Sequence, residues 1–109
     1  METERSETAV IATIQWSKHA QRDRTIARMS LENLNLHVAL DFEDSLKRAV
    51  KTLRSFPAIG RPGRLPNTRE LVSHKRYRII YRLKENKVTI LKLHNVSRPW
   101  SPRDYPFHD

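Results

Sequence analysis

Arginine is the residue type in this chain that is best suited to chemistry. Five arginines lie in or beside strand-like runs of the second half: Arg69, Arg76, Arg78, Arg82 and Arg98. A planar guanidinium grips a phosphate through two parallel hydrogen bonds, and it stabilises negative charge that develops on phosphorus in a transition state. Two acids, Glu70 and Glu85, lie close by in sequence as counter-ions. The set therefore predicts a surface for an anionic partner.

The positive charge of the chain is concentrated in the same half. The formal net charge is +9, from 21 Lys and Arg against 12 Asp and Glu. Residues 1–60 carry 9 basic and 8 acidic side chains, a difference of +1, whereas residues 61–109 carry 12 and 4, a difference of +8. This asymmetry favours one face for an anionic partner, of which nucleic acid is the commonest and an acidic protein the next. An ordinary solvated surface is the remaining interpretation.

Metal and cofactor chemistry find no support in the sequence. The chain has no cysteine, and its histidines lie in separate segments without the spacing of metal ligands: His19, His37, His74, His94 and His108. The two glycines, Gly60 and Gly63, stand among prolines and not in a phosphate-binding loop. We therefore expect no metal and no cofactor.

The first half of the chain predicts one strand and two helices. Residues 9–16 (AVIATIQW) form a β-branched run typical of a strand, and Ser17 follows as a helix N-cap. A weak apolar periodicity then predicts a first helix. A stronger periodicity over residues 36–56 predicts a second helix, with Asn35 as its N-cap and Pro57 just past its end. Two helices with so short a connection pack antiparallel.

The second half predicts three strands after a Gly/Pro corner. The strands are expected at residues 68–73, 76–83 and 87–93, with a tight turn at residues 85–86. Short turns between successive strands make an antiparallel meander. The strand at residues 9–16 must join this sheet at an edge or beside the last strand.

Alternation along the middle strand separates two kinds of side chain. The apolar face is expected beneath the helices: Tyr77, Ile79, Tyr81 and Leu83. The opposite face is expected to be open: Arg76, Arg78 and Arg82, with Ile80 among them. Because these arginines share one face of a rigid strand, we assign Arg76 and Arg82 to substrate binding along with Arg69.

These elements predict an α+β fold, in which an N-terminal strand and an antiparallel helix hairpin pack on a small, curled, mainly antiparallel sheet. We expect a single domain over residues 9–100, a flexible N-terminus over residues 1–8 and a polar, Pro-rich tail over residues 101–109. The sequence shows no secretory signal and no apolar run long enough to span a membrane, which predicts a cytoplasmic protein.

The order of motifs along the chain resembles that of the RelE/ParE superfamily of bacterial toxins, the toxin halves of type II toxin–antitoxin pairs. The motifs are WSKHA at 16–20, FPAIGRPGR at 56–64, NTRELV at 67–72, YRIIYR at 77–82 and VTILKLHNVSRPW at 88–100. Each motif alone is weak, but their order and spacing are fairly specific and cover nearly the whole chain. The resemblance implies the fold of that superfamily, two helices packed on a small antiparallel sheet.

The resemblance implies one of two activities. RelE-like members enter the ribosome and cut messenger RNA through attack of a 2′-hydroxyl on the adjacent phosphate, with basic side chains in place of a metal. ParE-like members do not cut RNA and instead poison DNA gyrase. Both are held inactive by an antitoxin segment that wraps the toxin. The implied partners are an acidic cognate antitoxin and either the ribosome with its mRNA or DNA gyrase.

Part of a RelE-like site carries over residue by residue. Arg78 matches a phosphate-binding arginine, and Arg98 matches a second arginine that stabilises the transition state. Arg69 matches one of two basic residues on the preceding strand, but the other falls at Leu71, which departs from the pattern. Tyr105 lies near the place of a C-terminal tyrosine that, in RelE-type enzymes, stacks on the RNA base or serves as a general base.

Two further residues are singled out beside these. His94 could act as a general base because an imidazole pKa near ~6.5 suits that role, although a structural histidine at a strand end is the other interpretation. Arg24 stands where many relatives have an apolar residue, so it is expected to extend toward solvent or to meet an acid such as Asp23 or Glu43.

Three functions remain open on the sequence. The first is a toxin that cleaves ribosome-bound mRNA with Arg78, Arg98 and His94 as catalytic residues. The second is a non-enzymatic poison of DNA gyrase, favoured by the incomplete catalytic set. The third is a non-toxic module that binds nucleic acid or an antitoxin.

Overall fold

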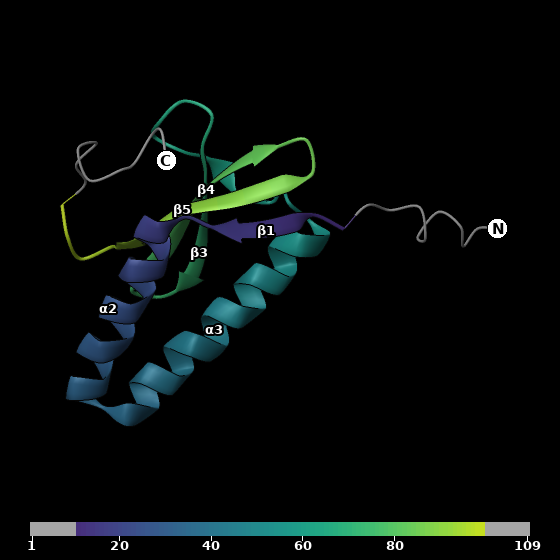
Figure 1. The fold of residues 1–109 in the computed structure, drawn as a ribbon. Helices are drawn as coiled ribbons and strands as arrows, with labels where there is room; N and C mark the ends of the chain where they lie inside the picture. The colour runs from purple at the N-terminus through teal and green to yellow at the C-terminus, as the bar shows by residue number, and fades with distance from the viewer. Residues whose placement is uncertain (1–10, 100–109) are drawn as a thin grey trace.

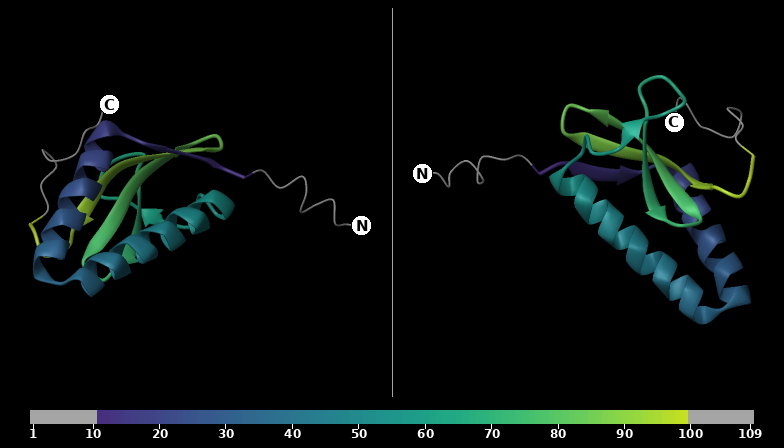
Figure 2. Two further views of the ribbon diagram at one scale, coloured as in Figure 1. Left: turned by 60° about the horizontal axis from the view of Figure 1, so that its bottom comes forward. Right: turned by 180° about the vertical axis from the view of Figure 1, so that it is seen from behind.

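The computed structural model describes residues 11–99 (Figure 1). In chain order its elements are β1 (Thr13–Trp16), α2 (Lys18–Leu34), α3 (Leu36–Ser55), β2 (Arg61–Pro62), β3 (Arg69–His74), β4 (Tyr77–Lys84) and β5 (Lys87–Asn95). The N-terminus expected to be flexible and the Pro-rich tail, with Tyr105, lie outside the described residues. The predicted α+β fold is confirmed, with the helix hairpin on one face of a five-stranded sheet (Figure 2).

The strand order of the sheet is β1-β5-β4-β3-β2. β3, β4 and β5 form the predicted antiparallel meander, and β1 lies at the edge, parallel to β5. The pairing of β1 with the last strand follows from the helical crossover that α2 and α3 make between them. β2 was not predicted, because it is only two residues long and lies in the Gly/Pro corner. Its Arg61 pairs with Glu70 of β3.

Both helices begin at the caps that the sequence predicts. The Ser17 side-chain oxygen accepts the Ala20 N–H at 3.0 Å, and the Asn35 side chain accepts the His37 N–H at 2.7 Å. Asn35 also ends the first helix, since its own N–H donates to the Leu31 carbonyl at 2.8 Å. One extended residue therefore closes α2 and opens α3, which forces the sharp reversal at the tip of the hairpin.

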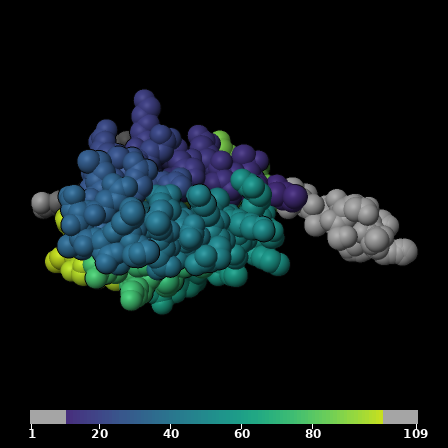
Figure 3. Space-filling view, turned by 90° about the horizontal axis from the view of Figure 1, so that it is seen from below, coloured from purple at the N-terminus to yellow at the C-terminus, as the bar shows by residue number. Residues whose placement is uncertain are grey.

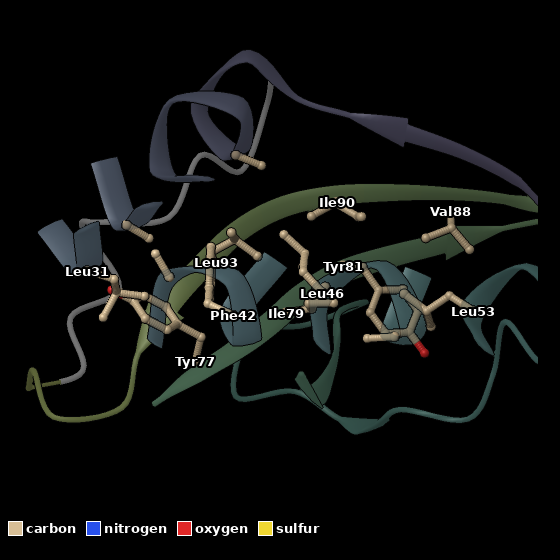
Figure 4. Close-up of a cluster of buried hydrophobic side chains, with 14 of the residues drawn as sticks. Leu31, Phe42, Leu46, Leu53, Tyr77, Ile79, Tyr81, Val88, Ile90 and Leu93 are labelled. Atoms are coloured by element: carbon tan, nitrogen blue, oxygen red, sulfur yellow. The ribbon is translucent and has the colours of Figure 1, made fainter. Parts of the chain in front are cut away.

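The core lies between the helices and the inner face of the sheet (Figure 4). Phe42, Leu46 and Leu53 of α3 are fully buried against the middle strands. Burial of each such side chain contributes roughly 1.5–3 kcal/mol. Tyr77, Ile79 and Tyr81 lie on the core side of β4, as the alternation predicts.

A β-bulge resolves the ambiguous alternation of β5. Tyr81 pairs with Ile90, but the preceding Ile80 pairs with Lys92, so Leu91 is an extra residue without a partner on β4. The bulge shifts the alternation by one residue. Ile90 and Leu93 therefore both belong to the core cluster, although they are an odd number of residues apart.

The corner after α3 is fastened to the core through Tyr81. The Tyr81 hydroxyl donates to the Pro57 carbonyl at 2.8 Å and accepts the Gly60 N–H at 2.9 Å. Burial raises the pKa of Tyr81, so the hydroxyl keeps its proton and its donor role. A Cβ atom at position 60 would lie 2.7 Å from this oxygen, which explains the glycine there.

Helix α2 protects the edge of β5 beyond the end of β1. The Asp23 carboxylate accepts the Leu93 N–H at 3.1 Å and lies 3.5 Å from the Lys92 ammonium group. Asp23 thus satisfies a backbone N–H of β5 at a point that β1 is too short to reach.

Candidate anion-binding site

Arg78 and Glu70 form a buried ion pair on the outer face of the sheet, opposite the helices. Arg78 Nη1 lies 3.3 Å from Glu70 Oε1, and the side chains are 17% and 3% exposed. The other carboxylate oxygen of Glu70 accepts the backbone N–H of Arg64 at 3.1 Å. Ile80 on the same face is also buried. The expected open arginine face is therefore open only in part, because its central arginine is already neutralised by a carboxylate of the same chain.

Part of the Arg78 guanidinium has no partner in residues 11–99. Its Nε is buried and makes no hydrogen bond within this part of the chain. An unsatisfied buried donor is costly, and such atoms are enriched at functional sites. Arg78 thus pairs with Glu70 through Nη1 while its buried Nε stays without a hydrogen bond in this part of the chain.

His94 lies directly across the ladder from Arg78. The two residues are Cα partners in the pairing of β4 with β5, and His94 is 7% exposed. Burial lowers the pKa of His94, and the positive charges of Arg64, Lys92 and Arg78 lower it further. The imidazole is consequently neutral at pH 7, which is the state that a general base needs.

Arg69 is separated from Arg78 by the sheet itself. It pairs with Tyr81, whose side chain lies on the core face, and its Nη1 donates to the carbonyls of Ala58 and Gly60 at 3.0 and 2.7 Å. The guanidinium therefore holds the corner after α3 in place. The predicted substrate-binding residue Arg69 and the predicted catalytic residue Arg78 therefore do not lie on one face of the sheet.

Arg76 and Arg98 lie at the end of the sheet where β4 begins and β5 ends. Both are exposed. Burial raises the pKa of Tyr77, and the positive charges of Arg98 and Arg76 oppose this rise. The Arg98 N–H donates to the Asn95 carbonyl at 3.0 Å in the turn after β5. Arg82 is half-buried on the outer face and pairs with Thr89.

Arg24 of α2 stands where many relatives have an apolar residue. It pairs with one of the two acids expected from the sequence. Its Nη2 lies 2.7 Å from Glu43 Oε1 on α3, and its guanidinium lies 5.1 Å from the ring centroid of Trp16. The other acid, Asp23, binds Leu93 and Lys92 instead.

The sequence reasoning missed two features of the outer face and the helices. The hydrogen bond from the Arg64 N–H to Glu70 was not expected. The Gly/Pro corner indicates that the chain turns back here, but it does not indicate which side chain the Arg64 N–H meets. A set of cations on α3 was also missed, since the first half is nearly neutral overall. Their spacing of four and three residues in the sequence could have revealed them: Lys47, Lys51 and Arg54.

Metal ligation and membrane insertion find no structural basis in the part of the chain that the structure describes. No group of three or more His, Asp or Glu side chains within residues 11–99 could hold a metal ion. None of the helices in this range is long and apolar enough to cross a membrane.

With the fold and site in place, comparison with known proteins identifies the class. The model of the ParE toxin family of type II toxin–antitoxin systems (parDE) matches residues 14–100, and the chain belongs to this family. Its place in the RelE/ParE superfamily, expected from the motifs, is thereby confirmed. A search of curated proteins found no match.

Two solved structures share the fold. A chain of the chromosomal ParDE toxin–antitoxin system from P. aeruginosa aligns with a TM-score of 0.68 at 21% identity, over 78% of this chain and 96% of that one. A chain of the toxin–antitoxin complex RelBE2 from Mycobacterium tuberculosis aligns with a TM-score of 0.52 at 24% identity, over 79% and 99%. At these identities the likeness establishes the RelE/ParE-like fold.

Proposed function

We propose that this ParE-family toxin arrests growth by binding DNA gyrase and does not cut RNA, and that an acidic cognate antitoxin neutralises it. The observation that carries the proposal is the buried Arg78–Glu70 pair. Metal-free cleavage of RNA depends on cations that converge on the scissile phosphate. Here the matching arginine is neutralised from within the chain.

The positions of the other assigned residues support binding over catalysis. Arg69 lies on the opposite side of the sheet from Arg78 and is engaged by two backbone carbonyls. The second basic position of the same strand is Leu71. A phosphate held at Arg78 would therefore lack the cations that the preceding strand supplies in RelE-type enzymes. A binding surface has no such requirement for convergence.

Ribosome-dependent mRNA cleavage is the second candidate function. It is favoured by one observation, the neutral His94 that lies across the ladder from Arg78. In this alternative His94 would take the proton from the 2′-hydroxyl, and Arg78 and Arg98 would stabilise charge on the phosphate. The alternative requires Arg78 to leave Glu70 when RNA binds.

The antitoxin part of the proposal rests on charge and on family. The chain carries +9, so a partner that covers its basic surfaces should be acidic. One structural relative was solved as a toxin–antitoxin complex. Gyrase and the ribosome are both cytoplasmic targets, and we infer the same compartment for this chain.

Purified gyrase tests the proposal directly. Relaxed plasmid, gyrase and ATP are incubated with the full chain, and supercoiling and double-strand cleavage are followed on gels. The proposal expects loss of supercoiling and accumulation of linear DNA, with both effects reversed by the antitoxin. Normal supercoiling at micromolar toxin, together with cut mRNA on programmed ribosomes, would establish the second candidate instead.

A further inference from the structure

The turn that follows α3 exposes large apolar side chains. Phe56, which caps α3, is 64% exposed, and Ile59 is 51% exposed. We call residues 56–60 the corner turn. It lies at one end of the molecule, where the end of α3 meets the start of β1 (Figure 3). The two elements are joined there by a hydrogen bond of 2.9 Å from the Ala12 N–H to the Arg54 carbonyl.

Hydrogen bonds hold the backbone of the corner turn in one shape. The Tyr81 hydroxyl donates to the Pro57 carbonyl at 2.8 Å and accepts the Gly60 N–H at 2.9 Å. Arg69 Nη1 donates to the carbonyls of Ala58 and Gly60 at 3.0 and 2.7 Å. The N–H of the fourth residue of the turn also donates to the carbonyl of the first at 3.0 Å. Side chains of the sheet therefore order a segment whose own apolar side chains face water.

An ordered and exposed apolar surface is suited to binding another protein. Contiguous apolar side chains in water mark interaction sites more often than isolated ones do. A surface that is already held in its bound shape loses little conformational entropy when a partner binds. Phe56 and Ile59 therefore fit the role of anchor side chains, the few residues that carry most of the binding energy of an interface.

Only cations flank the corner turn in the sequence. No Asp or Glu occurs between Asp44 and Glu70, whereas this stretch carries seven Lys and Arg residues. Arg54 and Arg61 lie just before and just after the turn, and both are exposed. Aromatic side chains and arginines are enriched in protein interfaces. A complementary partner therefore offers an apolar recess with carboxylates around it.

We propose that the corner turn is the surface through which this toxin binds its target protein, DNA gyrase. Phe56 and Ile59 enter an apolar recess of gyrase, and Arg54 and Arg61 pair with acids at its rim. This contact rests on the proposed function, since gyrase is the target assigned there. It gives a role to the FPAIGRPGR motif at 56–64, whose exposed apolar residues lie outside the candidate anion-binding site.

Other occupants fit the corner turn less well. An antitoxin segment that wraps the toxin needs a groove to lie in, whereas Phe56 and Ile59 extend from the surface. A nucleic-acid backbone would satisfy Arg54 and Arg61 but would leave the two apolar side chains in water. A second copy of this chain brings the same flanking cations, so two corner turns would repel each other.

The test measures binding of the full chain to purified gyrase. The toxin carries a fluorophore at its N-terminus, and its anisotropy is followed during titration with gyrase. F56S/I59S should bind gyrase at least about tenfold more weakly, because it removes both anchors. R54Q/R61Q should also bind more weakly, with an affinity that depends less on salt. Binding of F56S/I59S to the antitoxin should stay within about threefold of the unmodified chain.

A matched variant controls for the loss of exposed apolar surface. Ile26 and Met29 of α2 are each 55% exposed, so I26S/M29S removes a similar pair of side chains from another place. It should bind gyrase within about threefold of the unmodified chain. If F56S/I59S fails to fold, as seen by circular dichroism, F56A/I59A replaces it with the same expected direction.

Several results would overturn the contact at the corner turn. They are unchanged gyrase binding by F56S/I59S and an equal loss in I26S/M29S. A loss of antitoxin binding without a loss of gyrase binding would assign the turn to the antitoxin. Dimers of the unmodified chain that are absent from F56S/I59S would assign it to a second copy, and a loss of duplex DNA binding alone would assign it to nucleic acid.

The same titration separates this contact from the proposed function. An unmodified chain that does not bind gyrase would overturn both. An unmodified chain that binds and inhibits gyrase, with F56S/I59S equally active, would overturn the contact and leave the proposed function in place.

Discussion

Glu70 neutralises Arg78 inside the protein, with 3.3 Å between Oε1 and Nη1 and with the carboxylate side chain 3% exposed. Arg78, the residue that matches the phosphate-binding arginine of RelE-type nucleases, is thereby paired with an acid of the same chain. The same carboxylate also accepts the Arg64 N–H and so fixes the loop after β2. Glu70 is thus a structural residue, and the proposed function takes its pairing with Arg78 as the reason that the arginine face does not cut RNA.

Replacing Glu70 by alanine should destabilise the fold and expose the arginine. Removing one partner of a buried ion pair costs about 3–5 kcal/mol, because the other charge remains buried and unpaired. Glu70→Gln should cost less, since the amide oxygen still accepts a hydrogen bond, and it should raise affinity for single-stranded RNA. Urea unfolding and filter binding measure the two effects.

Glu32→Gln on the exposed surface of α2 is the control for that pair. Glu32 lies 3.9 Å from Arg28 and is 46% exposed, so its loss should leave stability nearly unchanged. An RNA affinity that does not rise in Glu70→Gln would show that Glu70 does not block Arg78.

Gly60 and Tyr81 should behave as a coupled pair. Gly60→Ala places a Cβ atom 2.7 Å from the Tyr81 hydroxyl, so overpacking should cost about 1–3 kcal/mol. Tyr81→Phe removes the hydroxyl but leaves the Gly60 N–H and the Pro57 carbonyl unpaired, at about 1–3 kcal/mol. The double variant should lose less than the sum, because the nearest contact, the hydroxyl, is gone, while the contacts with Tyr81 Cε1 at 2.8 Å and the Glu70 carbonyl at 3.0 Å remain.

A double-mutant cycle by urea unfolding checks this coupling. Strict additivity of the two single changes would contradict the proposed contact. Ala58→Gly in the same exposed corner serves as a comparison, since Ala58 is itself exposed.

His94 should make the stability depend on pH. Burial lowers its folded-state pKa below the usual 6.5, so the unfolded chain binds the proton more readily. Stability from this group is fully present above pH 6.5 and is lost as pH falls toward the lower folded-state pKa. Urea midpoints measured from about pH 8 to about pH 5 should fall in the unmodified chain and fall less in His94→Gln.

The matched control for that titration is His37→Gln on the exposed start of α3. It should keep the pH dependence of the unmodified chain. An unchanged slope in His94→Gln would show that His94 does not carry the effect.

His94 also separates the two candidate activities. A general base is needed for RNA cleavage but not for binding gyrase. His94→Gln should therefore still arrest growth when induced without antitoxin, at a similar level of soluble protein. Loss of arrest in a folded His94→Gln protein, together with uncut mRNA, would favour the nuclease. Absence of arrest in the unmodified chain would leave the non-toxic module.

Local sequence signals were sufficient for most of the fold. Ser17 and Asn35 cap their helices as expected, and the Tyr/Ile face of β4 lies in the core. The bulge at Leu91 could not be predicted, because it depends on which residues of β4 and β5 pair. The burial of Ile80 likewise depends on tertiary packing and not on alternation.

The candidate site was less predictable than the fold. Sequence proximity suggested that Arg69 and Arg78 act together, but their strand positions place them on opposite faces. Glu70 was visible as a possible counter-ion, whereas its burial and its bond to the Arg64 N–H were not. Charge counted over halves of the chain also concealed the cations of α3, since local acids balance them in the count.

Pulse labelling after induction of this chain without antitoxin can decide between gyrase and the ribosome, because it follows DNA synthesis and translation in the same cells. If gyrase is the target, thymidine incorporation falls first while incorporation of labelled amino acids continues. The paired Arg78 would then have no catalytic role. Translation that stops before DNA synthesis, with cuts in ribosome-bound mRNA, would contradict the proposed function.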